Sequence, residues 1–322
     1  MKIFITGIAG MIGFHTAKAL LKEGHDVWGI DNLNPFYDPS LKQRRIDILI
    51  ENGMPENQWI KEDICKPDSI AVINQPDKPF DMVLHLAAYP STRHSMEVPE
   101  LYIQSNIMGT SNIIKQCEKY SIPVVYASTS CVMHGQPLPW KEELAKVHYQ
   151  NNPYGWSKYA NECQFNHSTL PATVGLRFFT AYGPYGRPDM ALFEFTRKIV
   201  AGDPITAFNN GDMQRDFTYV EDIVQGVIIV LKAFHAGKFE KKHEIFNIGY
   251  GEKVQLMDFI RLIEKHLARK ANILFGPLHP ADTPVTWSDT RKIQKLGYKP
   301  TTSIREGVAK FIEWYKGYYN VS

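Results

Sequence analysis

A tyrosine and a lysine one helical turn apart form the most chemically suggestive pair in the chain. Tyr154 and Lys158 are spaced i, i+4 in the segment YGWSK, so they share one face of a helix. A free tyrosine, with a pKa of about 10, is a poor base at neutral pH. A nearby lysine ammonium favours the phenolate, which could then take a proton from a substrate hydroxyl. Thr129 ends an apolar segment, and its hydroxyl could either share that proton or make a simple strand-end hydrogen bond.

Three glycines near the start have the spacing of a phosphate-binding turn. Gly7, Gly10 and Gly13 follow the apolar segment 2–6 and precede a helical pattern over 14–23. Such a turn lets the backbone approach a pyrophosphate, whose charge interacts favourably with the amino end of the following helix. A turn that serves only packing is the alternative, and the strand before it and the helix after it favour dinucleotide binding.

An acidic residue ends the next predicted strand, 26–31. Asp31 lies 18 residues beyond Gly13, where a carboxylate can accept both hydroxyls of an adenosine ribose. It would repel a 2′-phosphate, and neither Asn32 nor Leu33 offers a cation to neutralise one. The sequence therefore predicts NAD rather than NADP. Asp63 could lie near the adenine, although a solvated loop acid is nearly as good an interpretation.

Alternating strands and helices must position these residues. Buried strands are predicted over 81–88, 123–129 and 173–179, with helices over 106–120 and from about Tyr154. This alternation predicts an α/β fold with a Rossmann-type doubly wound parallel sheet.

The chain changes in character after the strand 173–179. Glycine and proline become frequent, and further helices are expected over 191–201, 255–268 and 304–318. We expect this region to form a smaller α/β C-terminal substrate lobe. Ligands of such folds bind where the lobe meets the carboxyl ends of the strands.

Composition excludes several other classes of protein. The 322 residues are 44% hydrophobic and 22% charged, which is ordinary for a globular chain. A net charge of +2 provides no field for a nucleic acid, and without an apolar run of about 18 residues no membrane span is expected. Glycines interrupt the apolar start, which argues against a secretion signal. The four cysteines are scattered without a C-x-x-C pair, so we expect no metal site and a cytoplasmic location with reduced thiols.

Motifs along nearly the whole chain resemble those of the extended short-chain dehydrogenase/reductases, the NAD-dependent epimerase/dehydratase group. They occur in the family's order: TGIAGMIG (6–13), DNLN (31–34), HLAA (85–88), YAST (126–129), YGWSK (154–158), RDFTYVEDI (215–223) and NIGYGE (247–252). The resemblance implies an NAD-binding domain over 1–178, to which 216–248 returns, and a nucleotide-sugar-binding lobe from 179–215 and 249–322. It also implies that NAD contacts Gly7, Gly10, Met11, Ile12, Gly13, Asp31, Asn32, Asp63, Ile64, Leu86, Ala87, Ala88, Asn106, Tyr154 and Lys158.

Two further segments, 34–45 and 177–193, resemble those of the UDP-glucuronate 4-epimerases. That resemblance implies catalysis by Tyr154, Lys158 and Thr129. Tyr154 would take the proton from the hydroxyl at sugar carbon 4 while hydride passes to NAD. Hydride would then return to the opposite face of the 4-keto sugar. The UDP-sugar is the expected substrate, and helices 106–120 and 155–168 are expected to pair into a homodimer.

Substrate contacts are also implied by the resemblance. They are assigned to Thr129, Ser130, Thr180, Arg187, Phe208, Arg215 and Asp282. Ser130 and Thr180 could bond the sugar carboxylate. Arg187 could contact substrate or form a loop salt bridge, and Phe208 could line the uracil pocket or simply pack in the core. Arg215 would bind the pyrophosphate, and Asp282 would contact the uridine ribose.

Sister enzymes define the alternatives. Related 4,6-dehydratases carry Asp-Glu after the catalytic threonine and UDP-glucuronate decarboxylases a Glu two residues after it, where this chain has Ser130 and Cys131. This favours epimerisation over dehydration and decarboxylation. The chain departs from these relatives at 89–90, at 132–135 and at His279, which stands in place of a second phosphate-binding arginine. Because of these departures, a neutral UDP-hexose or a UDP-N-acetylhexosamine remains an alternative substrate. A non-catalytic regulator is the remaining alternative.

Overall fold

A seven-stranded sheet forms the centre of the computed structural model, which describes residues 1–73, 79–145 and 150–321. Every neighbouring pair of strands is parallel. The order is β11 (His243–Ile248), β6 (Thr173–Phe178), β5 (Val124–Thr129), β4 (Met82–His85), β1 (Lys2–Thr6), β2 (Asp26–Asp31) and β3 (Trp59–Lys61). The predicted α/β fold with a Rossmann-type doubly wound sheet is confirmed.

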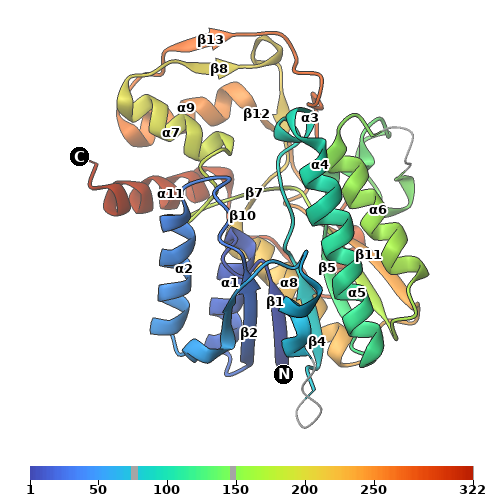
Figure 1. Ribbon diagram of the computed structural model, residues 1–322. Helices are drawn as coiled ribbons and strands as arrows, with labels where there is room; N and C mark the ends of the chain where they lie inside the picture. Colours follow the sequence, from blue (N-terminus) through green and yellow to red (C-terminus); the bar gives the residue numbers. More distant parts are fainter. Residues whose placement is uncertain (74–78, 146–149, 322) are drawn as a thin grey trace.

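The strands are apolar because both faces of the sheet are covered. Ile3 and Ile5 of β1 belong to one hydrophobic core, whereas Phe4 between them belongs to the other. Such alternation follows from the two-residue period of a strand. The first core includes side chains of α1 (Met11–Lys22), α2 (Pro39–Glu51) and α8 (Val220–His235). Helices α5 (Thr110–Lys119) and α6 (Pro153–His167) cover the opposite face (Figure 1).

Several element boundaries differ from those expected. The predicted helix 106–120 begins earlier, as α3 (His94–Glu97), α4 (Pro99–Tyr102) and the π-helical segment η3 (Ile103–Gly109), before α5 follows. The predicted strand 81–88 ends at His85, and the chain then leaves the sheet to line a cavity. Helix α2 was not anticipated.

A smaller lobe lies above the carboxyl ends of the central strands (Figure 1). Its helices are α7 (Ala191–Ala201), α9 (Leu256–Leu267) and α11 (Ile304–Tyr319), whereas the short α10 (Arg291–Gln294) packs on β11 of the central sheet. Its strands pair as β8 (Ile205–Ala207) with β13 (Ile273–Phe275), β9 (Gln214–Arg215) with β12 (Val254–Gln255), and β7 (Thr180–Tyr182) with β10 (Phe217–Tyr219). Short 3₁₀ turns are η1 (Glu56–Gln58), η2 (Pro67–Ile73), η4 (Ser130–Met133), η5 (Glu142–Leu144) and η7 (Asn209–Gly211).

Although β11 and α8 follow part of this lobe in sequence, β11 is a strand of the central sheet and α8 packs on α1. The proposed assignment of the two regions to cofactor and sugar remains a prediction. Among the described residues, no helix combines the length and apolar character needed to cross a membrane.

Candidate active site

A cavity of about 730 Å³ lies between the carboxyl ends of the sheet strands and the smaller lobe. It reaches the point where the strand order reverses, between β1 and β4, which is where doubly wound sheets bind ligands. Every residue that the sequence analysis assigned to catalysis, NAD or substrate lines the cavity except Asn106.

The glycine turn between β1 and α1 fits a dinucleotide pyrophosphate. Gly7 has φ +72°, and a β-carbon there would lie 2.7 Å from the Ala87 nitrogen. A β-carbon on Gly13 would lie 2.3 Å from the Gly7 oxygen. Helix α1 begins after Gly10 without a side-chain cap, so its first N–H groups remain available to an anion at the cavity wall. Met11 and Ile12 line the same wall.

Acidic groups lie at the expected adenosine end. The Asp31 carboxylate accepts hydrogen bonds from the backbone N–H groups of Ala9, at 3.2 Å, and Leu33, at 2.9 Å. Burial raises the pKa of this carboxyl group, and the nearby Lys42 ammonium acts in the opposite direction. Asn32 donates to Asp63 at 2.9 Å, and Ile64 lines the cavity beside them.

The segment after β4 forms another wall of the cavity. Leu86, Ala87 and Ala88 line it, and the Ala87 N–H donates to the Thr6 hydroxyl at 3.1 Å. Asn106, by contrast, is fully buried behind this wall. Its side chain accepts from the Tyr89 N–H at 2.7 Å and donates to the Tyr89 carbonyl at 3.1 Å. Asn106 thus supports the backbone of Tyr89 and is not among the residues that line the cavity, and its contact with NAD remains a prediction.

Strand β5 and helix α6 position the three predicted catalytic residues at the cavity. The Asn152 side chain caps α6 by accepting from the Gly155 N–H at 2.7 Å. Tyr154 lies in the first turn and Lys158 one turn later, while Thr129 ends β5. All three line the cavity, so residues 25 positions apart in the chain meet at one place.

The ionisation of this pair is governed by burial. Burial raises the pKa of Tyr154 to about 12, with Cys131 acting in the same direction, while a Thr129 hydrogen bond and the charge of Arg187 lower it. Burial also lowers the pKa of Lys158 to about 8. The protein groups alone therefore do not lower the pKa of Tyr154, because the effect of desolvation is larger than the effects of Thr129 and Arg187. The positive nicotinamide ring of NAD supplies charge of the required sign when bound.

The predicted sugar contacts surround the catalytic residues. Ser130 and Thr180 line the cavity with the hydroxyl groups expected there. Arg187 lines it as well, and its guanidinium donates to Asp189 at 3.0 Å. Arg187 thus forms the loop ion pair that was its alternative interpretation, while remaining at the cavity.

Arg215, Phe208 and Asp282 lie at the cavity's expected nucleotide end. Asp282 forms an ion pair of 2.7 Å with Arg93, whose guanidinium carbon lies 3.9 Å from the centre of the Phe208 ring. The sequence analysis missed Arg93, because a position 189 residues from its partner leaves no local signal.

The segment 132–135, which departs from the family's usual sequence, contacts the same region. His134 forms a 2.7 Å hydrogen bond with the Thr283 hydroxyl. Thr283 lines the cavity, so the segment 132–135 contacts the cavity wall through His134 without lining the cavity itself.

Two buried cations also escaped sequence analysis. Lys42 lines the cavity near Asp31, and burial lowers its pKa to about 8. Arg45 is fully buried and donates to the Ala9 carbonyl of the glycine turn at 2.6 Å. It also donates to the Tyr185 carbonyl at 2.7 Å, and so ties the glycine turn to the loop that carries Arg187.

Together, the doubly wound sheet, the glycine turn and the Tyr-Lys pair define an NAD-dependent enzyme of the extended short-chain dehydrogenase/reductase type. The sequence profile described as "NAD dependent epimerase/dehydratase family" matches residues 3–249. The chain belongs to this family.

Several relatives match over the whole chain. A probable UDP-glucuronate 4-epimerase from Rhizobium meliloti is 35% identical, with 99% of this chain and 98% of that protein covered. UDP-glucuronate 4-epimerase 4 from Arabidopsis thaliana is 37% identical, with 99% and 76% covered. The crystal structure of UDP-glucuronic acid 4-epimerase from Bacillus cereus, in complex with UDP-glucuronic acid and NAD, superimposes with a TM-score of 0.88 at 32% identity, covering 99% and 100% of the two chains.

Proposed function

We propose that the protein is a UDP-glucuronate 4-epimerase, which converts UDP-glucuronate to UDP-galacturonate through a transient 4-keto sugar. The observation that carries the proposal is the catalytic trio at a cavity where the residues after Thr129 are Ser130 and Cys131. Neither is a carboxylic acid, so the acid that the dehydratases use is missing. Named relatives at 35% and 37% identity support the same substrate.

Three residues of the chain transfer the proton of the hydroxyl group at sugar carbon 4. Tyr154 accepts it from the hydroxyl, Thr129 shares the hydrogen bond, and the Lys158 ammonium stabilises the resulting negative charge. NAD, when bound, supplies the acceptor and then the donor of the carbon-bound hydrogen as hydride. Tyr154 returns its proton to the oxygen at the end of the reaction, so no acid, base or reductant is consumed.

The hydroxyl groups near the sugar protect the carboxylate in this proposal. A 4-keto uronic acid is a β-keto acid and loses carbon dioxide when the breaking carbon–carbon bond aligns with the carbonyl π system. Ser130, Thr180 and Arg187 can hold the carboxylate out of that alignment. At the other end of the cavity, Arg215 is assigned to the pyrophosphate, Asp282 to the ribose and Phe208 to the uracil.

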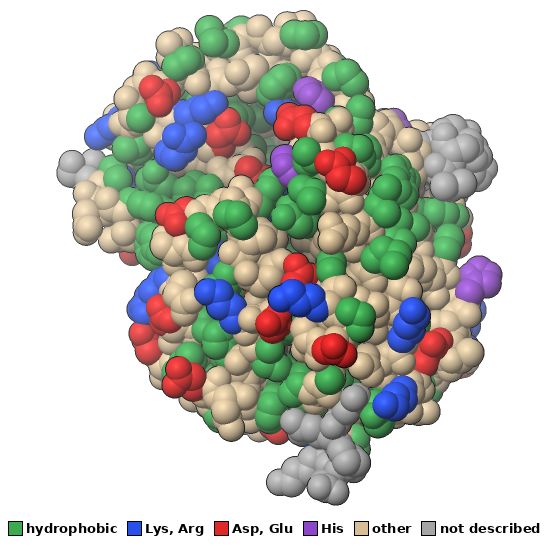
Figure 2. All heavy atoms as spheres, viewed as in Figure 1, with side chains coloured by type: hydrophobic (Ala, Val, Ile, Leu, Met, Phe, Trp, Pro, Cys, Tyr) green, Lys and Arg blue, Asp and Glu red, His purple; other side chains and the backbone are tan. Residues whose placement is uncertain are grey.

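A homodimer is part of the proposal. Met96, Ile103 and Met108 are 49%, 45% and 55% exposed on the helical run before α5. Hydrophobic side chains gather over α3 and α4 in Figure 2. We expect Met108→Glu to convert the dimer to a monomer with impaired activity. Leu274→Glu, at a 53% exposed position on β13, is the matched control, and sedimentation analysis would detect the change. A dimer that persists in Met108→Glu contradicts this assignment.

Proton NMR of the reaction products tests the proposed function. Purified protein is incubated with UDP-glucuronate and catalytic NAD, and UDP-galacturonate is expected to grow to a stable mixture without net NADH. Formation of a UDP-pentose would instead establish a decarboxylase. Turnover of UDP-glucose or a UDP-N-acetylhexosamine, with UDP-glucuronate unchanged, would establish a neutral-sugar epimerase. Absence of turnover with all these substrates would favour a regulator.

A further inference from the structure

A buried carboxylate lies beneath the proposed catalytic pair. Glu162 follows Tyr154 and Lys158 on α6 at intervals of eight and four residues, so the three side chains share one face of the helix. Glu162 is only 7% exposed. It does not line the cavity, and the proposed proton transfer does not use it.

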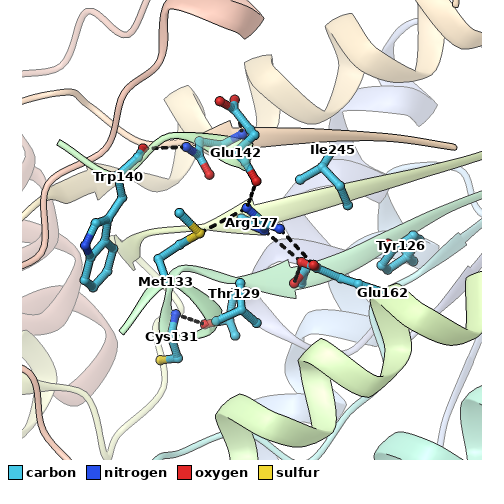
Figure 3. A network of polar contacts seen from close by, with 12 residues as sticks. Tyr126, Thr129, Cys131, Met133, Trp140, Glu142, Glu162, Arg177 and Ile245 are labelled. Atoms are coloured by element: carbon cyan, nitrogen blue, oxygen red, sulfur yellow. Dashed lines mark hydrogen bonds and ion pairs between the residues drawn. The ribbon is translucent and has the colours of Figure 1, made fainter. Parts of the chain in front are cut away.

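Two neighbouring strands hold this carboxylate (Figure 3). Arg177 of β6 donates to both Glu162 oxygens, each at 2.8 Å. Ser128 of β5 donates to Oε1 at 2.6 Å. Because Ser128 directly precedes Thr129, one carboxylate contacts the strand that carries Thr129 and belongs to the helix that carries Tyr154 and Lys158.

The remaining donors of Arg177 are also engaged. Its Nη1 donates to the Glu142 carbonyl at 2.7 Å and contacts the Met133 sulfur at 3.0 Å, as Figure 3 shows. Buried ion pairs of this kind add little stability over apolar replacements, because desolvation offsets their attraction. A gain in stability therefore does not explain the charged pair at this place. The position of Glu162 one helical turn from Lys158 points instead to an electrostatic role.

We propose that Glu162, held by Arg177 and Ser128, is a positioning residue that keeps Lys158 charged and aligned beside Tyr154. The inference rests on the proposed roles of Tyr154 and Lys158 as base and cation. Arg177 limits the field of the carboxylate and fixes its orientation.

The electrostatic surroundings of Lys158 support this role. Burial lowers the pKa of Lys158, and Glu162 is the charge that opposes this effect. The elements packed against α6 also carry His94, Glu97, Glu100, Tyr102, Lys115, Cys117, Glu118, Lys119, Tyr126, Cys131 and Arg177, and His85 lies on the neighbouring strand β4. His85 stays neutral, because burial and the charge of Lys158 lower its pKa to about 3. Burial raises the pKa of Tyr126, Tyr102 and Cys131 above their usual values. Glu162 is thus the charge among these groups that raises the pKa of Lys158.

The two members of the ion pair should act with opposite sign. Glu162→Gln removes the charge that keeps Lys158 protonated, so the ammonium is lost at lower pH and the pKa of Tyr154 rises. Arg177→Gln removes the partner that limits the field of Glu162, so Lys158 stays charged to higher pH and the pKa of Tyr154 falls. Charges one to two helical turns away predict shifts of roughly 0.5–2 pH units. A purely structural role would reduce activity without shifts of opposite sign.

Tyrosinate absorbance of the NAD-loaded protein measures this directly. Each variant is titrated against the same variant carrying Tyr154→Phe, so that the difference reports Tyr154 alone. We expect an upward shift for Glu162→Gln, because the Lys158 ammonium is lost, and a downward shift for Arg177→Gln. Ser128→Ala, which removes a hydrogen bond but no charge, and Arg177→Lys should leave the pKa unchanged. Unshifted titrations, or shifts of the same sign, would overturn the inference.

Two features keep the test decisive. Glu162→Gln preserves the shape of the side chain, so its comparison with Ser128→Ala decides the matter alone if Arg177→Gln does not fold. The titration uses no sugar. Failure to convert UDP-glucuronate would therefore contradict the proposed function while leaving this measurement intact.

Discussion

Replacing Gly13 by alanine tests whether the glycine turn requires close backbone contact. The added β-carbon would lie 2.3 Å from the Gly7 oxygen and 2.9 Å from the Ile8 α-carbon. Both are backbone atoms, so no flexible side chain can move aside. Overpacking of this kind costs about 1–3 kcal/mol or more. Alanine gains at most ~1 kcal/mol of helix propensity over glycine, so the clash is expected to dominate.

Thermal unfolding with and without NAD measures the effect. In a chain of this size, each kcal/mol changes Tm by roughly 2 °C. We expect Gly13→Ala to lower Tm by several degrees and to reduce the increase in Tm that NAD produces, because the turn can no longer approach the pyrophosphate. Gly317→Ala in α11 is the matched control, since no atom lies within 4 Å of its β-carbon, and it should be neutral or stabilising. Equal stability and equal NAD response of Gly13→Ala and wild type would refute the reasoning.

Two further outcomes follow from buried cations. Arg45→Met should reduce the NAD retained on purification and raise KM for the UDP-sugar about tenfold, because it leaves buried carbonyl acceptors unpaired at about 1–3 kcal/mol each. The exposed neighbour Arg44 provides the control, and normal retention by Arg45→Met would contradict the expectation. Activity should fall as pH rises above about 8, because Lys158 carries its positive charge only below its lowered pKa; a kcat profile that stays flat from pH 6 to 10 would be incompatible with this account.

Local patterns in the sequence were sufficient to predict the elements that surround the expected cofactor site. The β1–turn–α1–β2 unit follows from strand and helix periodicities on either side of three glycines, and Asp31 ends a strand whose position was read correctly. Helix α7 was predicted with its observed boundaries, 191–201. In each case, the signal lies within about twenty residues.

Contacts between distant segments were not predictable in this way. Arg45 reaches Tyr185 across 140 positions, and Arg93 reaches Asp282 across 189. The contact of the Asn106 side chain with the Tyr89 backbone was not predicted either, because it lies within a π-helical segment that periodicity does not reveal. Burial raises the pKa of Tyr154 among the protein groups alone, an effect that local patterns do not reveal because desolvation depends on the whole fold.

Conversion of UDP-glucuronate carrying deuterium at sugar carbon 4 tests the central claim most directly. If carbon 4 is transiently oxidised and reduced within one site, UDP-galacturonate should retain deuterium at that carbon, with none released to water. Tyr154→Phe should abolish the conversion, since the hydroxyl proton would have no acceptor. Product with protium at carbon 4, or inversion that survives in Tyr154→Phe, would contradict the account.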